Sequence, residues 1–252
     1  MTTFAFLDAI PSPSILMFSS EIIDRSNHYT YNPAAFNFIL MFEFYLLKLS
    51  VRLVAFSRDA LALESDVSKP TSVEKLVTDV ITHFGRLDIL VNNAGICPRI
   101  SIEDMTEERF DQLININLKS VFFLSRAAAE AMKPNQWGRI INLSSTGGRI
   151  GGVHNATVYG ATKAGILAMT KSFARHYAKY NILVNSVAPG AVETRMMTSL
   201  PDATLQGVID TAPLNRLANP AEIASTIVFL SSERASWITG ATLDVNGGTL
   251  ML

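Results

Sequence analysis

The sequence predicts an α/β fold in which a parallel sheet lies between helices, giving three layers, α/β/α. Two observations support this prediction. From residue 60 onward, short apolar runs typical of strands alternate with amphipathic helical patterns. The chain has 252 residues, a length that suits one large α/β domain. We therefore expect a single domain over 1–252, with an irregular portion over 1–50.

The predicted elements follow one another at short spacing. Apolar residues recur at helical intervals from Val73 to Phe84, with Thr71 and Glu74 as a capping box and Gly85 as the stop. Runs such as 87–91 (LDILV) are typical of buried strands. Strands are expected over 61–67, 87–91, 139–143, 182–187 and 241–245, and helices over 106–132, 157–179 and 220–231.

The first part of the chain differs in composition. All 14 glycines lie at Gly85 or later, although average usage would place about six before it. Residues 34–56 are apolar enough to suggest a membrane-spanning helix. Glu43 near its middle would cost about 2.5 to 3.5 kcal/mol, so we favour a buried helix that runs into a strand.

Composition also argues against several classes of function. The formal net charge is −1 and the basic residues are scattered, so we expect no nucleic-acid binding. Cys97 is the only cysteine, which excludes an intrachain disulfide or a cysteine metal cluster and favours a reducing compartment, the cytoplasm. We expect no metal, and we interpret Cys97, His154 and His176 as ordinary structural or surface residues.

Tyr159 and Lys163 lie four residues apart in a segment of helical character, so their side chains project from one face. A phenol with its ordinary pKa near 10 is poorly suited to give and take protons near neutrality. A lysine ammonium one turn away favours the phenolate and lowers that pKa. Taken alone, such a pair is also typical of a solvated surface contact.

Ser145 ends a predicted strand and precedes Tyr159 across a glycine-rich loop over 144–152. Sheets of this kind bind substrates where the carboxyl ends of strands face a crevice. A hydroxyl there can donate to a carbonyl oxygen and orient it toward the phenol. The alternative is a serine that only caps the loop, and neighbouring Ser144 could be confused with it.

Asn117 lies on the apolar face of the predicted helix 106–132, where an unpartnered amide is costly. Either it satisfies backbone groups at a kink, or it holds a water that links Lys163 to solvent. Both can be true together.

Two polar turns follow buried strands. Asn92-Asn93-Ala94-Gly95 follows the strand 87–91, and Pro189-Gly190 follows the strand 182–187, with Thr194 beyond. At such turns the backbone can approach a ligand closely, and the amides can tie strands together. The alternative interpretation is a pair of ordinary turns.

Together these features resemble the short-chain dehydrogenase/reductase family, in the branch of 3-oxoacyl-acyl-carrier-protein reductases. The resemblance implies a Rossmann-like doubly wound parallel sheet. No single motif is decisive, but their joint order and spacing are highly specific. The matching motifs are Asp66-Val67, Asn92-Asn93-Ala94-Gly95, Asn117, Ser145, Tyr159-x-x-x-Lys163, Asn185-x-x-x-Pro189-Gly190, and Ile238-Thr239-Gly240 to Asn246-Gly247-Gly248.

The resemblance also implies a role for each matching residue. Tyr159 would be the general acid in reduction and the general base in oxidation. Lys163 would lower its pKa and hold the nicotinamide ribose, Ser145 would position the substrate oxygen, and Asn117 would support the proton relay. The implied reaction is hydride transfer between NAD(P)H and a small-molecule carbonyl or secondary alcohol. The implied cofactor contacts are Asp66 and Val67 at the adenine, Asn93, Ala94 and Gly95 at the adenosine ribose side, and Pro189, Gly190, Val192 and Thr194 at the nicotinamide.

The start of the chain departs from the family pattern. Family members carry a Thr-Gly-x-x-x-Gly-x-Gly turn, whose glycines let the backbone approach the pyrophosphate at a helix N-terminus. Here residues 28–33, a poor phosphate loop, would precede a helix over 34–48 and a second strand over 51–57. Ser57 and Arg58 end that strand, and an arginine facing the extra phosphate favours NADP over NAD.

Three hypotheses follow. In the first, the chain is a working NADP-dependent reductase with an unusual start. In the second, the altered start cannot hold a dinucleotide, and the chain serves as a partner subunit or binding module. The third covers membrane attachment or another use of the fold. The substrate class stays open among keto-acyl groups, keto-sugars, steroids and small ketones.

Assembly and access to the site are also predicted. By resemblance, the helices over 106–132 and 157–179 would form a homodimer or homotetramer interface. The segment with Met196, Met197 and Leu200 is expected to form a mobile lid over an apolar substrate site. Ordinary packing explains these methionines equally well.

Overall fold

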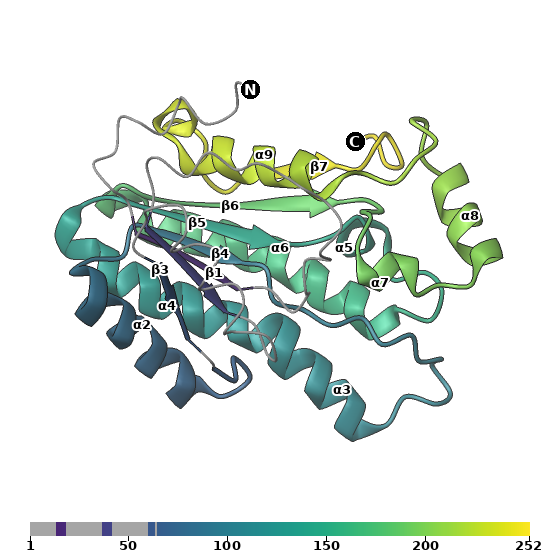
Figure 1. The fold of residues 1–252 in the computed structure, drawn as a ribbon, viewed down its shortest axis with the longest axis horizontal. Coiled ribbons are helices and arrows are strands. Elements are labelled where there is room, and N and C mark those ends of the chain that lie inside the picture. Colours follow the sequence, from purple (N-terminus) through teal and green to yellow (C-terminus); the bar gives the residue numbers. More distant parts are fainter. Residues whose placement is uncertain (1–13, 19–36, 42–59, 64) are drawn as a thin grey trace.

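The computed structural model describes residues 14–18, 37–41, 60–63 and 65–252 (Figure 1). Seven strands in these residues form one sheet in the order β3-β2-β1-β4-β5-β6-β7, and all neighbouring strands run parallel. The predicted parallel α/β sheet is therefore confirmed. The strands are β1 (Ser14–Phe18), β2 (Asn37–Met41), β3 (Ala60–Ala62), β4 (Ile89–Asn92), β5 (Gly138–Leu143), β6 (Ile182–Pro189) and β7 (Thr242–Val245).

Helices cover both faces of the sheet. Figure 1 shows α2 (Pro70–Phe84), α4 (Ser120–Met132) and α6 (Thr157–Tyr177) on one face, and α9 (Pro220–Ser231) on the other. Both α4 and α6 contact β5, and α9 contacts β5 and β6 from the opposite side. The three-layer arrangement follows, because each helix buries its apolar stripe against a sheet face.

The core consists of two apolar clusters, one on each face of the sheet. Ile140 and Ile141 are consecutive in β5 and fully buried, yet they belong to different clusters. Successive side chains of a strand point to opposite faces, which explains this division. Val80 of α2 and Leu124 of α4 join the first cluster, and Leu230 of α9 joins the second.

Helix α2 begins differently from the prediction. Its N-cap is Lys69, which makes no side-chain capping bond, so the predicted capping box of Thr71 and Glu74 is wrong. Pro70 occupies the first turn, where its missing N–H needs no partner. Gly85 is confirmed as the stop: its φ is 78°, and its N–H donates to the Ile81 carbonyl at 2.8 Å.

The predicted single helix over 106–132 is interrupted in its middle. Helix α3 (Glu107–Ile114) passes through a π-helical turn, Asn115–Lys119, into α4. Such turns are rare and are frequent near functional sites. The kink considered for Asn117 in the sequence analysis is therefore this π turn.

The segment 144–152 is not wholly a loop, because it contains a short helix, α5 (Gly147–Ile150). The predicted strand 61–67 is shorter than expected, since β3 ends at Ala62. The strands predicted over 87–91, 139–143, 182–187 and 241–245 and the helix predicted over 157–179 lie within a few residues of β4, β5, β6, β7 and α6. Helix α9 begins and ends at the predicted residues, and Asn219 and Glu222 form a complete capping box there. Besides α5, two further α-helices of the described residues were not predicted: α7 (Arg195–Thr198) and α8 (Asp202–Asp210).

The first part of the chain supplies strands rather than the expected helix. Residues 37–41 form β2, so the helix predicted over 34–48 is wrong for these residues. Parallel pairing with β1 on one side and β3 on the other satisfies the backbone of β2, and such tertiary pairing overrides local propensity. The predicted strand 51–57 and phosphate loop 28–33 lie outside the described residues.

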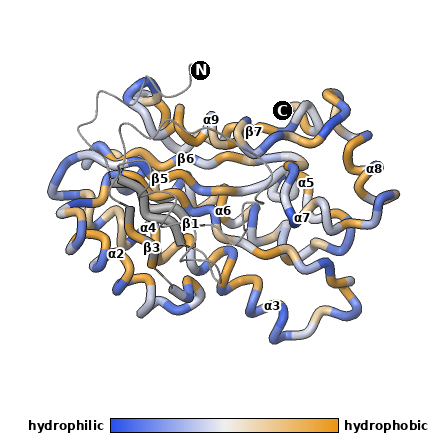
Figure 2. Tube along the Cα trace, in the orientation of Figure 1, coloured by the Kyte–Doolittle hydropathy of each residue, from blue (hydrophilic) through white to orange (hydrophobic). Residues whose placement is uncertain are grey.

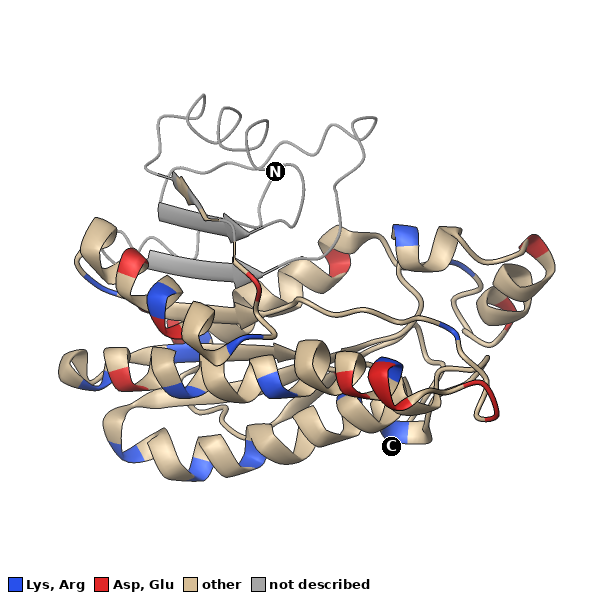
Figure 3. Cartoon of the chain, turned by 90° about the horizontal axis from the view of Figure 1, so that it is seen from below, with Lys and Arg blue, Asp and Glu red and all other residues tan. Residues whose placement is uncertain are grey.

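The helices are amphipathic, and charges are mixed over the surface. In Figure 2, hydrophobic and hydrophilic residues alternate along α2 and α3. Figure 3 shows basic and acidic residues interspersed along the helices in view. Among the described residues, no helix combines the length and apolar character needed to cross a membrane.

Candidate active site

Three strand ends meet at one edge of the sheet, near α5 in Figure 1. β4, β5 and β6 are parallel neighbours, so their carboxyl ends share this edge. The turns after them carry Asn93, Ser145 and Gly190 respectively. The chain order of the strands reverses between β1 and β4, and open α/β sheets bind ligands at such a point.

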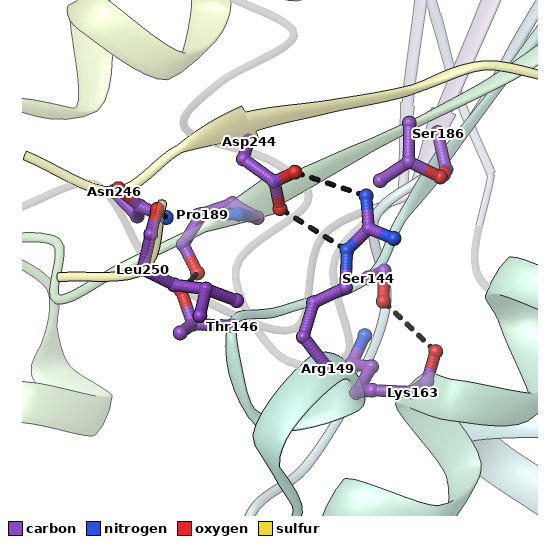
Figure 4. A network of polar contacts seen from close by, with 10 residues as sticks. Ser144, Thr146, Arg149, Lys163, Ser186, Pro189, Asp244, Asn246 and Leu250 are labelled. Atoms are coloured by element: carbon purple, nitrogen blue, oxygen red, sulfur yellow. Dashed lines mark hydrogen bonds and ion pairs between the residues drawn. The ribbon is translucent and has the colours of Figure 1, made fainter. Parts of the chain in front are cut away.

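Two adjacent serines after β5 have different partners. Ser144 is buried, and its hydroxyl donates to the Lys163 carbonyl at 2.8 Å (Figure 4). Ser145 is partly exposed, and its Oγ accepts from the Gly147 N–H at 3.1 Å. A Cβ added to Gly147 would lie 3.5 Å from Ser145 Oγ and 3.9 Å from the Tyr159 ring. Ser145 and Tyr159 therefore both lie next to Gly147, whereas the Ser144 hydroxyl is bonded to the backbone of α6.

Lys163 is buried close to Tyr159. Its Nζ lies 5.6 Å from the Tyr159 ring centroid and donates to the Leu143 carbonyl at 2.6 Å. Burial lowers the pKa of Lys163 from 10.5 to about 8, while the nearby Cys97 opposes this shift. Lys163 therefore carries a buried positive charge near neutral pH, held in place by a carbonyl at the end of β5.

The π turn places Asn117 against the loop that follows β4. Asn117 Oδ1 accepts from the Ile96 N–H, and Nδ2 donates to the Ile96 carbonyl, each at 2.8 Å. Nδ2 also reaches Thr162 Oγ1 at 3.4 Å. A Cβ added to Gly95 would lie 3.4 Å from Asn117 Oδ1 and 3.5 Å from Lys163 Nζ. Asn117 thus satisfies backbone groups, the first alternative considered for it, and the water link to Lys163 stays a prediction.

Buried amides tie the strands behind the site together. Asn92 Nδ2, at the end of β4, donates to Asn142 Oδ1 at 2.8 Å and to Ser125 Oγ at 2.9 Å. Asn142 Nδ2 in turn donates to Thr170 Oγ1 at 2.9 Å. These bonds link β4, β5, α4 and α6, so the strand ends are held at fixed positions relative to the helix that carries Tyr159.

The turn after β6 is fixed on both sides. The Pro189 carbonyl accepts from the N–H and the hydroxyl of Thr146, at 2.9 and 3.0 Å. Gly190 donates its N–H to the Val245 carbonyl at 3.0 Å, and a Cβ there would lie only 2.8 Å from Asn246 Cα. Only glycine permits this close approach. The turn therefore bridges the Ser145 turn and the last strand.

The segment beyond Gly190 carries further predicted contacts. Val192 forms an isolated parallel bridge with Ala218, and Thr194 Oγ1 donates to the Val192 carbonyl at 3.4 Å. Thr194 precedes α7, and Leu200 is buried. The predicted movement of this segment as a lid stays a prediction.

The predicted adenine contacts lie elsewhere in the structure. Asp66 and Val67 follow β3, which is the edge strand of the sheet and is separated from β4 by β2 and β1. Asp66 accepts from the Ser68 hydroxyl and pairs with Lys69. Both contacts lower the pKa of Asp66, and the Ser68 hydroxyl has the larger effect. Val67 packs against the first core cluster. Ser57 and Arg58 lie outside the described residues.

The described residues suit the nicotinamide half of a dinucleotide. Gly95 leaves space next to Lys163 Nζ, because the Cβ of any other residue there would lie 3.5 Å from that nitrogen. Lys163 is a buried donor, and the Pro189-Gly190 backbone lies at the same edge of the sheet. The residues predicted to meet the phosphates, 28–33 and Arg58, are outside the described part of the chain.

Two features of this region carried no signal in the sequence. Cys97 follows the Gly95 turn and is partly buried, and burial raises the pKa of its thiol against the opposing charges of Arg99 and Lys163. Arg149 of α5 forms a two-pronged ion pair with Asp244, from which it is separated by 95 positions. No local pattern links residues so far apart.

The chain is similar to known proteins over most of its length. A sequence profile of the family described as enoyl-(acyl carrier protein) reductase matches residues 47–249. The 3-oxoacyl-[acyl-carrier-protein] reductase FabG of Salmonella typhimurium is 43% identical over 187 residues, which cover 74% of this chain and 76% of the relative. FabG of Staphylococcus aureus is 40% identical over 193 residues, covering 77% and 78%.

Solved structures share this fold over most of the chain. The crystal structure of gox2181 superposes with a TM-score of 0.85 at 26% identity, covering 94% of this chain and 96% of the other. A protein of Sinorhizobium meliloti 1021, proposed to be a short-chain alcohol dehydrogenase, superposes with a TM-score of 0.84 at 30% identity and the same coverage.

Proposed function

Since the chain belongs to the short-chain dehydrogenase/reductase family, we propose that it is an oxidoreductase that reduces the keto group of a 3-oxoacyl thioester with NADPH. One observation carries this proposal: Ser145 and Tyr159 flank Gly147 at the carboxyl end of β5, with the Lys163 ammonium buried beside them. The FabG relatives are named as reductases of 3-oxoacyl groups on acyl carrier protein, which supports the substrate class.

The side chains divide the work on the carbonyl oxygen. Ser145 accepts from the Gly147 N–H, so its own hydroxyl hydrogen is available to donate to the substrate oxygen. Tyr159 gives its proton to the same oxygen as the carbonyl becomes an alcohol. The Lys163 ammonium stabilises the phenolate that remains, in a buried setting where charge interactions are strong. Asn117 is a positioning residue that holds the loop after β4.

The cofactor proposed is NADPH, which when bound supplies the hydride. Lys163 would hold the nicotinamide ribose, residues 93–95 the adenosine ribose side, and residues 189–194 the nicotinamide. Asp66 and Val67 would meet the adenine. The preference for NADP rests on Arg58, whose guanidinium suits a phosphate better than a ribose hydroxyl.

The assembly proposed is a homodimer or homotetramer of single-domain chains in the cytoplasm. Phe110 of α3 and Phe122 of α4 are 44% and 39% exposed. Phe122 also packs edge-on against Phe173 of α6, with ring centroids 5.4 Å apart. We propose that Phe110, Phe122 and Phe173 belong to one apolar face, which forms the interface.

Titration of the purified protein with NADPH and with NADH tests the proposal. Saturable binding, tighter for NADPH, is expected, and reduction of acetoacetyl-coenzyme A should follow as loss of NADPH absorbance. If neither nucleotide binds saturably at millimolar concentration, the reductase proposal fails, and a binding module built on this fold becomes the better hypothesis.

The substitution Tyr159→Phe tests the role of the phenol. Turnover of acetoacetyl-coenzyme A should fall by at least about a hundredfold, because the proton donor is lost. The NADPH dissociation constant should stay within about twofold, since only an oxygen is removed from the binding site. Tyr180→Phe is the matched control, because Tyr180 lies in the short 3-10 helix Ala178–Tyr180, which follows the far end of α6, and should not affect turnover. Unchanged turnover in Tyr159→Phe would refute the assigned role.

A further inference from the structure

Helix α5 carries the Ser145 turn, and its far end is anchored to the last strand. The Gly148 N–H donates to the Ser145 carbonyl, and the Arg149 N–H donates to the Thr146 carbonyl, both at 2.9 Å. From this turn the Arg149 guanidinium reaches Asp244 of β7 (Figure 4). Nε lies 3.2 Å from Oδ1, and Nη2 lies 2.9 Å from Oδ2.

The short helix packs closely against α6 through its glycines: a Cβ added to Gly148 would lie only 2.7 Å from the Lys163 backbone carbon. Four of the residues between 147 and 152 are glycines, which add backbone freedom and no side-chain contacts. Ile150, the last residue of α5, is 53% exposed. A Cβ added to Gly151 would have no heavy atom within 4 Å. Ser144 and Thr146 fix the entry to the turn, and Arg149 adds a link from α5 to β7.

The ion pair has the geometry of a strong one. Both prongs of the guanidinium meet both oxygens of the carboxylate, an arrangement that a lysine cannot reproduce. The side chains of Arg149 and Asp244 are only 22% and 23% exposed. Partial burial weakens screening by salt, whereas fully exposed pairs contribute little.

We propose that the Arg149–Asp244 ion pair positions Ser145 for catalysis, by holding α5 against β7. The link runs through Gly147, whose N–H is bonded to Ser145 Oγ and therefore sets the orientation of that hydroxyl. A shift of α5 moves Gly147, and Gly147 moves the hydroxyl away from the substrate oxygen. This inference rests on the proposed reductase function, and it adds two positioning residues that touch neither substrate nor cofactor.

Single and paired substitutions test the proposal. Arg149→Gln and Asp244→Asn should each lower kcat for acetoacetyl-coenzyme A by about tenfold to a hundredfold, because small misplacements of a catalytic group are costly. The NADPH dissociation constant should stay within about twofold in both. The exchanged pair Arg149→Asp with Asp244→Arg should have a higher kcat than either Arg149→Gln or Asp244→Asn. Arg149→Lys keeps the charge but not the two-pronged geometry, so its kcat should stay below that of the exchanged pair. Lys75→Gln, which breaks the ion pair with Asp79 on α2, is the matched control and should leave kcat unchanged.

A double-mutant cycle shows whether the pair acts through Ser145. In a Ser145→Ala background, Arg149→Gln should lower kcat no further, because the hydroxyl that it positions is already absent. If Arg149→Gln lowers kcat equally in both backgrounds, or if neither single variant changes kcat, the positioning role is overturned.

A measurement that needs no activity separates this proposal from the reductase proposal. Amide hydrogen exchange in peptides over 144–152 should speed up in Arg149→Gln and Asp244→Asn, and not in Lys75→Gln. If the wild-type protein has no reductase activity, the reductase proposal fails, and the exchange result alone decides whether the pair anchors α5. If α5 exchanges at the wild-type rate in both variants, the anchor itself is refuted.

Discussion

The buried charge of Lys163 has a cost in stability that can be measured. Burial lowers its pKa to about 8, from the ordinary 10.5, because few groups replace the water that an ammonium loses. The unfolded chain therefore holds a proton between about pH 8 and 10.5 that the folded protein has released. The free energy of unfolding rises with pH across this window, and the penalty is fully present below it.

We predict that Lys163→Met removes this pH dependence. The difference in unfolding free energy between wild type and variant should change by about 3 kcal/mol between pH 7 and 10.5, with the variant gaining its relative advantage at low pH. Urea unfolding at several pH values measures it. A difference for Lys163→Met that stays flat between pH 7 and 10.5 would contradict the prediction.

At the same scale, the sequence could place the main chemical groups but not all their partners. Spacing predicted that Tyr159 and Lys163 share a helix face, and the structure brings both to Ser145. Sequence reasoning could not separate Ser144 from Ser145, because both end the same strand. Arg149 and Asp244 were out of reach, since only the parallel register of β6 and β7 brings Asp244 near α5.

Among the elements, the π turn links a helix to the loop after β4. Asn117 makes two hydrogen bonds to Ile96, both at 2.8 Å, and its side chain is fully buried. A regular helix would direct this side chain differently, because the π turn alters the phase of the residues that follow. Amphipathic spacing predicted one long helix, since the extra residue leaves the apolar pattern nearly intact on both sides.

We predict that Asn117→Ala destabilises the protein by roughly 1 to 3 kcal/mol, because the Ile96 N–H and carbonyl lose their partners in a partly buried place. Asn115→Ala is the matched control within the same turn. The Asn115 side chain accepts from the Lys119 ammonium at 3.2 Å, so its loss should cost less than about 0.5 kcal/mol. Denaturant midpoints measure both, and equal costs would argue against the role of the Ile96 bonds.

Two helical glycines should respond in opposite ways to alanine. At Gly160 of α6, an added Cβ would lie 2.3 Å from the Gly152 backbone nitrogen, whereas at Gly207 of α8 it would meet nothing within 4 Å. Gly160→Ala should therefore cost about 1 to 3 kcal/mol and lower turnover, because it displaces the chain beside Tyr159. Gly207→Ala should stabilise by about 0.5 to 1 kcal/mol. Thermal unfolding with a turnover assay checks the pair, and the same sign for both would be contrary evidence.

For the whole molecule, the exposed aromatic face predicts self-association. Light scattering after gel filtration at micromolar concentration should give the mass of a dimer or tetramer. Phe122→Glu should lower that mass, because a charge would be buried in an apolar contact. Ile102→Glu is the control, since Ile102 is 71% exposed and lies outside the long helices. A monomer in the wild type, or an unchanged mass in Phe122→Glu, would rule out this face as the interface.

The overall architecture was predictable because alternation of strand and helix patterns is a property of long segments. It held from β4 to β7, where each predicted strand lies within a few residues of its place. It failed where local pattern and long-range pairing disagree, as in β2, which reads as helical but pairs between β1 and β3. The sheet order itself could be inferred only through the family resemblance.

The position of β1 in the sheet imposes an order on events during synthesis. β1 lies between β2 and β4, and Ile15 pairs with Ile89 of β4. The ribosome therefore delivers the first described strand long before its second neighbour exists. By contrast, β4 to β7 gain their neighbours in the order in which they are made. Of the described strands, β1 is made first. Its edge toward β4 has no partner until the chain has grown past α2, the helix that follows β3.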